Sequence, residues 1–404
     1  MSAAPLADVK VLDFMWVIAG PSATRVLGDY GATVVRVEST RRIDTARTLA
    51  PFHGGRPGAE RSGLFHNANS NKRMLTLDPT NPAGRAVVLD LVRWADVVTE
   101  SFAPGVMHRW GLDYATLRTV RPDVVMLSTC LMGQTGPWAS FAGYGNLAAA
   151  IAGFSNLGGW PDRPPAGPFS AYTDYVSPRF IATAILAALE YRRRTGAGQF
   201  IDLSQAEASL HFLAVALLDH AANGRLPSRV GNRDPVMVPH GVYPAAGDDR
   251  WVAIAVDGDR SFQALCSAME RRALARDPRF ASAEARRAHE AALDDEVSAW
   301  TRGREAASIE TLLQSRGVAA SAVQDSAALC ADPQLAHRGH LLRIPHARLG
   351  TTTVEGTRFQ LSRTPAHLPD DAPTYGRDTG SVLSDLLGYD ETRITELVRS
   401  GALE

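Results

Sequence analysis

Apolar and polar positions in the first third of the chain alternate between strand-like and helix-like spacing. Short apolar runs predict strands at residues 9–14, 33–38, 74–78, 97–100 and 124–129. Helical stretches are predicted between them at about 20–30, 82–94 and 114–120. This βαβ rhythm predicts an α/β fold with a parallel, doubly wound sheet.

The pattern changes after residue 178. Long helices are predicted over 178–223, short strands at 241–244 and 251–256, charged helices from 262 to about 313 and a strand at 317–323. These elements predict a smaller α+β domain. Strand-like alternation follows at 350–361, and helix at 379–400. The segment 41–73, with six arginines and several Gly, Pro and Asn residues, is expected to be a functional loop because it is too long for a simple connection.

A strong helix start follows Asp174. Ser177 is a good N-cap and Pro178 suits the first helical position, while Arg192–Arg194 and Gly196 favour a helix end. Asp174 is therefore predicted to lie just ahead of a positive helix end. An Asp at such a place is most often a cap or a dipole partner, and a nucleophile is the alternative.

Composition excludes several classes of protein. The 404 residues are enough for two domains, and the net charge of −1 indicates neither a nucleic-acid nor an anionic-membrane partner. Cys130, Cys266 and Cys330 are too scattered for a disulfide framework. No leader and no apolar stretch long enough to span a membrane is evident, so we expect a cytoplasmic protein.

Common cofactor and nucleophile motifs are absent from the sequence. The turn after the first strand does not match G-x-G-x-x-G, and neither a P-loop nor G-x-S-x-G occurs, so no redox nucleotide is expected. His337 and His340 lack further ligand partners, and no metal is expected. Cys130 follows a predicted strand but has no neighbouring His, which favours a structural role.

Several segments together resemble the family III coenzyme A transferases, the CaiB/BaiF group that includes formyl-CoA and carnitine CoA-transferases. The segments are Val11–Phe14, Ala19–Pro21, Gly31–Glu38, Asn71–Arg73, Phe102–Val106, Gly133–Pro137, Asp174 with its helix and Arg194–Gln199, and Asp332–Gln334. Each is weak alone, and their order and spacing carry the resemblance.

The resemblance implies the family fold. A large Rossmann-like, CoA-binding domain would comprise residues 1–200 and 360–404, and a small α+β domain residues 226–325. Linker helices would cover 201–225 and a second linker 326–359. The resemblance also implies an interlocked homodimer.

The resemblance further implies transfer of CoA from an acyl-CoA donor to a free carboxylic acid, with acyl-CoA as substrate. Asp174 would be the nucleophile, kept ionised by the helix N-terminus, and would carry first an anhydride and then an aspartyl-CoA thioester. Ala19, Phe102, Lys72, Arg73 and Arg109 are expected to bind CoA, the cations through its phosphates.

The expected substrate pocket includes Ile18, Tyr144 and Gly145. An α-methylacyl-CoA racemase remains the alternative on this fold, but Tyr144 stands where its histidine would be, which disfavours proton exchange. Gly145 replaces a glutamate of formyl-CoA transferase and is expected to open space for a larger or more apolar acid. A heteromeric CoA-transferase subunit is the other alternative.

Overall fold

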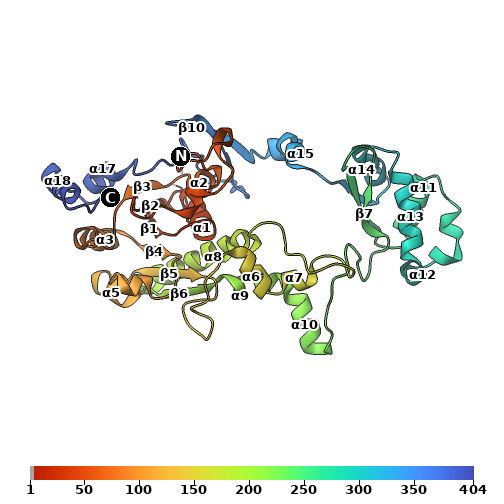
Figure 1. Ribbon diagram of the computed structural model, residues 1–404, viewed down its shortest axis with the longest axis horizontal. Coiled ribbons are helices and arrows are strands. Elements are labelled where there is room, and N and C mark those ends of the chain that lie inside the picture. Colours follow the sequence, from red (N-terminus) through yellow and green to blue (C-terminus); the bar gives the residue numbers. More distant parts are fainter. Residues whose placement is uncertain (1–3) are drawn as a thin grey trace. The chain divides into compact units, whose positions relative to one another are not determined.

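The computed structural model describes residues 4–404 and confirms an α/β fold with a parallel sheet (Figure 1). Contacts divide the chain into two compact units, which are described separately. The first comprises the chain up to Ser155, Gly167–Leu226 and Gln334–Glu404; the second comprises Asn156–Ala166 and Pro227–Pro333. The segment 201–225, expected as linker helices, belongs to the first unit, and the expected linker 326–359 is divided between the second unit, up to Pro333, and the first, from Gln334.

A six-stranded parallel sheet forms the centre of the first unit. Its strands are β1 (Lys10–Phe14), β2 (Thr33–Glu38), β3 (Arg73–Thr76), β4 (Val97–Glu100), β5 (Val125–Cys130) and β6 (Phe200–Ser204). The order is β3-β2-β1-β4-β5-β6, so the winding reverses between β1 and β4. A reversal of this kind leaves a crevice beyond the carboxyl ends of the two strands, where ligands bind in open α/β sheets.

Helices are found throughout the described residues. In chain order they are α1 (Ala19–Asp29), α2 (Gly63–Asn69), α3 (Pro82–Trp94), α4 (Val106–Arg109), α5 (Tyr114–Val120), α6 (Gly145–Ile151), α7 (Phe154–Leu157), α8 (Tyr172–Thr195), α9 (Gln205–Leu210), α10 (Ala214–Asn223), α11 (Asp259–Ala268), α12 (Ala283–Ala288), α13 (Glu290–Thr301), α14 (Ala306–Ser315), α15 (Ser326–Ala331), α16 (Pro333–His337), α17 (Thr379–Ser381) and α18 (Glu391–Arg399). Short 3₁₀ turns and one π-helical segment, Val382–Leu386, connect some of them.

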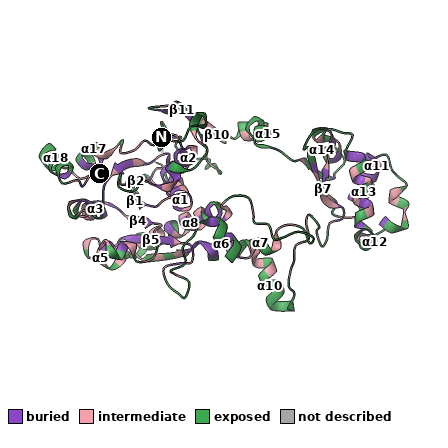
Figure 2. Ribbon diagram, viewed as in Figure 1, coloured by how far each residue is buried: buried purple, intermediate pink, exposed green. Residues whose placement is uncertain are grey.

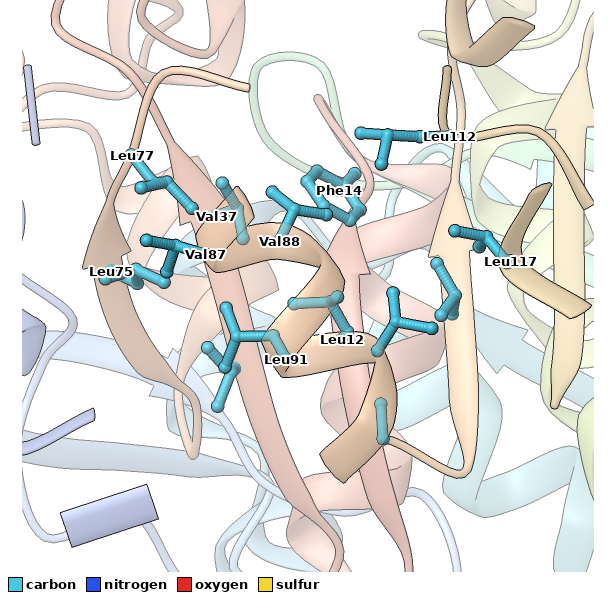
Figure 3. Packing of buried hydrophobic residues seen from close by; sticks show 14 of the residues in the cluster. Leu12, Phe14, Val37, Leu75, Leu77, Val87, Val88, Leu91, Leu112 and Leu117 are labelled. Atoms are coloured by element: carbon cyan, nitrogen blue, oxygen red, sulfur yellow. The ribbon is translucent and has the colours of Figure 1, made fainter. Parts of the chain in front are cut away.

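The central strands are buried on both faces, as their apolar runs predicted (Figure 2). On one face, Leu12 and Phe14 pack against Val88 and Leu91 of α3 (Figure 3). On the other face, Val11 belongs to a cluster with residues of α1 and α8. The sheet is therefore the middle of three layers. Packing on both of its faces fixes the positions of the strand ends.

The C-terminal segment joins the first unit beside β3 (Figure 1). The Thr379 hydroxyl accepts a hydrogen bond of 3.0 Å from the Thr76 amide, and the Asp378 carboxylate accepts one of 2.7 Å from the Met74 amide. Side chains of the chain end therefore cap an edge strand that would otherwise expose unpaired amides.

The first unit differs from the predictions in three elements. The strand β6 was not predicted, and neither was β10 (Leu341–His346), which pairs antiparallel with β11 (Gly350–Glu355). The segment 41–73 is not a plain loop, because it contains α2 and two 3₁₀ turns.

The second unit contains an antiparallel sheet of β7 (His240–Pro244), β8 (Trp251–Ala255) and β9 (Ala319–Ala322). Phe262 and Leu265 of α11, Leu293 and Val297 of α13, and Leu313 of α14 form its core with the strands. It has the α+β character that the sequence predicted.

Two buried histidines connect the hairpin β10–β11 to α2. The Nε2 atoms of His66 and His346 lie 3.2 Å apart, and His66 Nδ1 lies 3.0 Å from Thr352 Oγ1. Burial, with His346 and Arg47 nearby, lowers the pKa of His66 to about 4. Only one hydrogen can occupy the short Nε2–Nε2 contact, so the pair is stable when at least one ring is neutral.

We therefore expect His66→Gln to make stability less dependent on pH. Unfolded His66 takes up a proton near pH 6.5 and the folded residue only near about 4, so its contribution is present above 6.5 and is lost as the pH falls towards 4. Urea unfolding measures the free energy of unfolding at about pH 7 and about pH 5. Between these two pH values, the variant should lose on the order of 1–2 kcal/mol less of this free energy than the wild type. Exposed His337→Gln is the control, and an unchanged pH dependence in His66→Gln would contradict the prediction.

Candidate active site

A cavity of about 880 Å³ lies in the first unit, beyond the carboxyl ends of the central strands. Segments that follow β1, β2, β4 and β5 line it, together with the loop 139–144. Asp174 from α8 and Gln205 from α9 complete the lining. The cavity thus lies where the order of the sheet predicts a ligand crevice.

The loop from β1 to α1 forms one wall and is held from both sides. The Trp16 amide donates to Ser101 Oγ after β4 at 2.8 Å, and the Val17 amide donates to Asp44 at 3.0 Å. Val17 has a φ of 66°, a left-handed conformation that is unusual for a β-branched residue. A backbone held in such a conformation by its neighbours, at a cavity wall, is typical of a functional site.

Asp174 lies in the first turn of α8, not ahead of the helix. The helix begins at Tyr172, so the expected start at Ser177 and Pro178 is wrong. Ser177 Oγ donates to the Thr173 carbonyl at 2.8 Å instead of capping, and Pro178 lies inside the helix without the amide that would bond to the Asp174 carbonyl. The end at Gly196, with a φ of 73°, is as predicted.

The Asp174 carboxylate is buried, with 6% of the residue exposed. Gln205 Nε2 donates a hydrogen bond to Asp174 Oδ1. Burial raises the pKa of Asp174, and the Gln205 amide and the Gly145 backbone amide act against that rise. The resemblance implies that the helix N-terminus keeps the carboxylate ionised, but the larger effect in the structure is desolvation, which disfavours the charge.

Gly145 lies against this carboxylate. A Cβ atom at residue 145 would lie 2.8 Å from both Cγ and Oδ1 of Asp174 and 3.0 Å from Ala171 Cβ. The interpretation that Gly145 opens space for a larger acid is therefore wrong, because Asp174 fills that space. Glycine at this position lets the carboxylate approach the backbone.

The structure brings together five of the residues expected at the site. Ile18, Ala19, Phe102, Tyr144 and Asp174 all line the cavity. Tyr144 is 59% exposed, in a position where its side chain can contact a bound molecule. Cys130 also lines the cavity, but burial raises the pKa of its thiol, so it is a poor competitor as a nucleophile.

The expected CoA-binding cations lie elsewhere. Lys72 is buried, and its ammonium donates to Asp13 Oδ2 at 3.0 Å, to the Pro21 carbonyl at 2.9 Å and to Asn69 Oδ1 at 3.0 Å. These contacts use all three of its donors. Arg73 begins β3 and Arg109 is exposed on α4, and neither is among the residues that line the cavity.

Two other arginines line the cavity instead. Arg41 and Arg42 follow β2 at the start of the arginine-rich segment, and both are exposed. The Arg42 guanidinium lies 5.4 Å from the centre of the Trp16 ring, and Arg41 lies 3.4 Å from the buried Asp78 carboxylate. They are the cations of the lining that an anionic ligand can reach.

Sequence reasoning missed Gln205 because it missed β6. The alternation of apolar Ile201 and Leu203 with polar Asp202 and Ser204 was the available signal. Had this strand been predicted, Gln205 would have followed the carboxyl end of a parallel strand, where site residues gather.

Among the described residues, no group of three or more His, Cys, Asp or Glu side chains could hold a metal ion. None of the helices within residues 4–404 is long and apolar enough to cross a bilayer.

Comparison with known proteins decides the family. The sequence model that describes CoA-transferase family III matches residues 6–379. The chain belongs to CoA-transferase family III. Among its relatives, the succinyl-CoA–D-citramalate CoA-transferase of Chloroflexus aurantiacus is 32% identical over 393 residues, 97% of this chain and 96% of the relative. The succinate–glutarate CoA-transferase of Agrobacterium fabrum is 33% identical over 392 residues, with coverage of 96% and 97%.

A solved structure supports the same assignment. The crystal structure of a CaiB/BaiF family protein from Brucella suis matches with a TM-score of 0.86 and 31% identity, over 95% of this chain and 100% of that chain. The protein is thus an enzyme of the CoA-transferase class, and the resemblance identified from the sequence is confirmed.

The buried pair of Lys72 and Asp13 gives a prediction for this CoA-transferase. Lys72→Met should lower the free energy of unfolding by ~3–5 kcal/mol, because the Asp13 carboxylate stays buried without its cation. Chemical denaturation measures this, and Lys10→Met, at the chain's other lysine, is the control with a change of less than ~0.5 kcal/mol. If Lys72→Met unfolds like the wild type and only raises KM for acyl-CoA, Lys72 binds CoA instead.

Burial of Asp174 gives a second prediction. The folded-state pKa lies above the unfolded value, so stability is lost as the pH rises from the unfolded pKa through the folded one, and the ionised carboxylate destabilises the fold at higher pH. Asp174→Asn should therefore raise Tm by about 1–4 °C at neutral pH. The gain should shrink as the pH falls towards the ordinary aspartate pKa, and a scanning-calorimetry series that shows no gain at neutral pH would contradict it.

Proposed function

We propose that the enzyme transfers CoA from an acyl-CoA donor to a free carboxylic acid through covalent intermediates on Asp174. The observation that carries this proposal is a buried carboxylate in the lining of the cavity of about 880 Å³, held by an amide donor. The other candidate nucleophiles are less suitable, because burial raises the pKa of Cys130 and Lys72 is fully occupied by its partners.

The chemistry follows from the leaving groups. Asp174 attacks the thioester carbonyl and displaces CoA thiolate, which leaves a mixed anhydride. The thiolate then attacks Cγ of Asp174 and releases the donor acid, which leaves an aspartyl-CoA thioester. The acceptor carboxylate repeats these steps in reverse. Each step exchanges acyl derivatives of similar reactivity, so the sequence needs no ATP.

We propose that Arg41 and Arg42 contact the phosphates of CoA. They are exposed cations in the cavity lining, and guanidinium groups bind phosphate oxygens in a bidentate way. Arg73 and Arg109 would then have no direct part, since they lie outside the lining.

The acids named in the relatives suggest the substrate class. Those relatives transfer CoA between succinate and citramalate or glutarate, and another, from Acetobacter aceti, is an acetyl-CoA:oxalate CoA-transferase. Because Gly145 does not open space for a larger apolar acid, we propose a dicarboxylic acid as the acceptor, with succinyl-CoA as the first donor to test.

The alternatives have specific observations against them. Within the described chain, the cavity lining contains no histidine, and a racemase needs a second acid–base group opposite the aspartate. Two relatives from Chloroflexus aurantiacus are named as alpha and beta subunits of one transferase, each 30% identical. The presence of Asp174 favours a catalytic chain. Exposed apolar residues of α10, such as Val215 at 85% and Leu218 at 66%, indicate a surface that a partner subunit covers, and we propose that this partner is a second copy of the chain.

Asp174→Asn tests the proposal. We expect at least a roughly thousand-fold loss of CoA transfer with acyl-CoA binding retained, because the amide cannot attack the thioester. Transfer is followed by chromatography of the CoA esters, and binding by calorimetry. Exposed Asp8→Asn is the matched control with full activity.

Trapping gives an independent readout. Wild-type enzyme incubated with succinyl-CoA and hydroxylamine should carry a hydroxamate at Asp174 by mass spectrometry, and Asp174→Asn should not. An unmodified Asp174 together with α-proton exchange in deuterated water would reject the transferase mechanism in favour of the racemase.

A further inference from the structure

Gln205 has a backbone position that several contacts fix. It is the first residue of α9 and follows β6 directly, where Ser204 pairs with Cys130 of β5. The Ala206 amide donates to the Leu131 carbonyl at 3.0 Å, and the Ser209 hydroxyl donates to the Gln205 carbonyl at 2.9 Å. The end of the sheet therefore determines where the Gln205 side chain begins.

The Gln205 side chain is directed at Asp174. Only 8% of Gln205 is exposed, and its Nε2 donates to Asp174 Oδ1 and lies 3.2 Å from Thr173 Oγ1. A flipped amide would place its oxygen against the carboxylate, so the donor orientation is the favourable one. Thr173 Oγ1 in turn donates to the Gly145 carbonyl at 3.0 Å.

Gly145 completes the surroundings of the carboxylate. The clash that any Cβ would make with Asp174 shows how closely the backbone at residue 145 approaches Oδ1. Oδ1 thus lies between the Gln205 amide and the Gly145 backbone, both away from bulk water. Donors held in this way are placed before charge develops on the oxygen that they contact.

We propose that Gln205 is a further catalytic residue of CoA transfer, the donor that binds Oδ1 of Asp174 while negative charge develops on it. The inference rests on the proposed function, in which Asp174 forms covalent intermediates. With Oδ1 bound, the other carboxylate oxygen, Oδ2, is the one that attacks the thioester and becomes the bridging oxygen of the anhydride.

Gln205 acts in the step that forms the aspartyl-CoA thioester. CoA thiolate attacks Cγ of the anhydride, a C–S bond forms, and the electron pair of the C=O bond moves to Oδ1. The Gln205 amide stabilises this oxyanion together with the Gly145 amide. The electron pair then returns, the Cγ–Oδ2 bond breaks, and the donor acid leaves as a carboxylate that keeps Oδ2. No proton is gained or lost, so a neutral amide donor is sufficient.

Two variants of similar volume test this role. Gln205→Met removes the donor, and we expect kcat to fall about 10²–10³-fold with KM for succinyl-CoA changed less than about threefold. Gln205→Glu places a second carboxyl beside Asp174. The pKa of Asp174, already raised by burial, should rise further in both variants, since the amide lowers it. The acid limb of kcat/KM should therefore move to higher pH, most in Gln205→Glu.

The controls separate this inference from the proposed function. Gln199→Ala removes a glutamine outside the cavity lining and should keep wild-type kcat and pH profile. Wild-type Tm in Gln205→Met, with the lower kcat and the shifted acid limb, would support the inference. An unchanged kcat, or a lower kcat with an unshifted acid limb, would overturn it while the inactivity of Asp174→Asn left the aspartyl mechanism standing. Full activity of Asp174→Asn would overturn both.

Discussion

A buried carboxylate, Asp13, is the interaction on which the arrangement of the first unit depends. Its Oδ2 accepts from Thr24 Oγ1 at 2.7 Å and from Lys72 Nζ at 3.0 Å, and its Oδ1 accepts from the Met15 amide at 2.9 Å and from Thr99 Oγ1 at 3.1 Å. A buried charge is tolerated only with such partners, so β1, α1, β4 and the segment before β3 must all be in place together. Through Met15 the same group fixes the start of the loop that carries Val17 and Ile18 into the cavity.

Asp174, a buried carboxylate in the cavity lining, has the opposite character. Asp174 has amide donors but no cation beside it, so burial raises its pKa where the partners of Asp13 hold the pKa of that carboxyl down against burial. A carboxylate neutralised by Lys72 would be a weak nucleophile with no room for substrate. In the proposed mechanism Asp174 would remain reactive because the fold supplies hydrogen bonds without a counterion. The free energy that its burial costs must be offset by packing in the rest of the core.

The sequence predicts much of this fold, and its failures have physical causes. The ranges of β2, α3, β4 and α5 follow from apolar periodicity alone, because those elements lie in one continuous core. β6 and β10 are half-exposed, so their apolar pattern is weak. The start of α8 was misplaced because Ser177 and Pro178 carry strong local signals that tertiary contacts of Thr173 and Asp174 override.

Some candidate site residues could be predicted from the sequence and others could not. Asp174, Ile18 and Phe102 were found because family patterns mark them, whereas the role of each cation depends on partners far away in the sequence. Lys72 donates a hydrogen bond to Asp13, which lies 59 residues earlier in the sequence. Gln205 was missed because its contact with Asp174, 31 residues away, forms only when β6 brings the two residues together.

The arginine-rich segment shows how the fold separates cations of one sequence cluster. Arg47 is buried between Glu38 at 2.8 Å and Glu60 at 3.3 Å, with its guanidinium 3.7 Å from the centre of the Phe65 ring. These contacts hold the segment against β2 and α2. Arg41 and Arg42, a few residues earlier, have no such enclosure and line the cavity. Because the buried arginine fixes the segment, the proposed binding of a phosphate by the exposed pair would cost little conformational entropy.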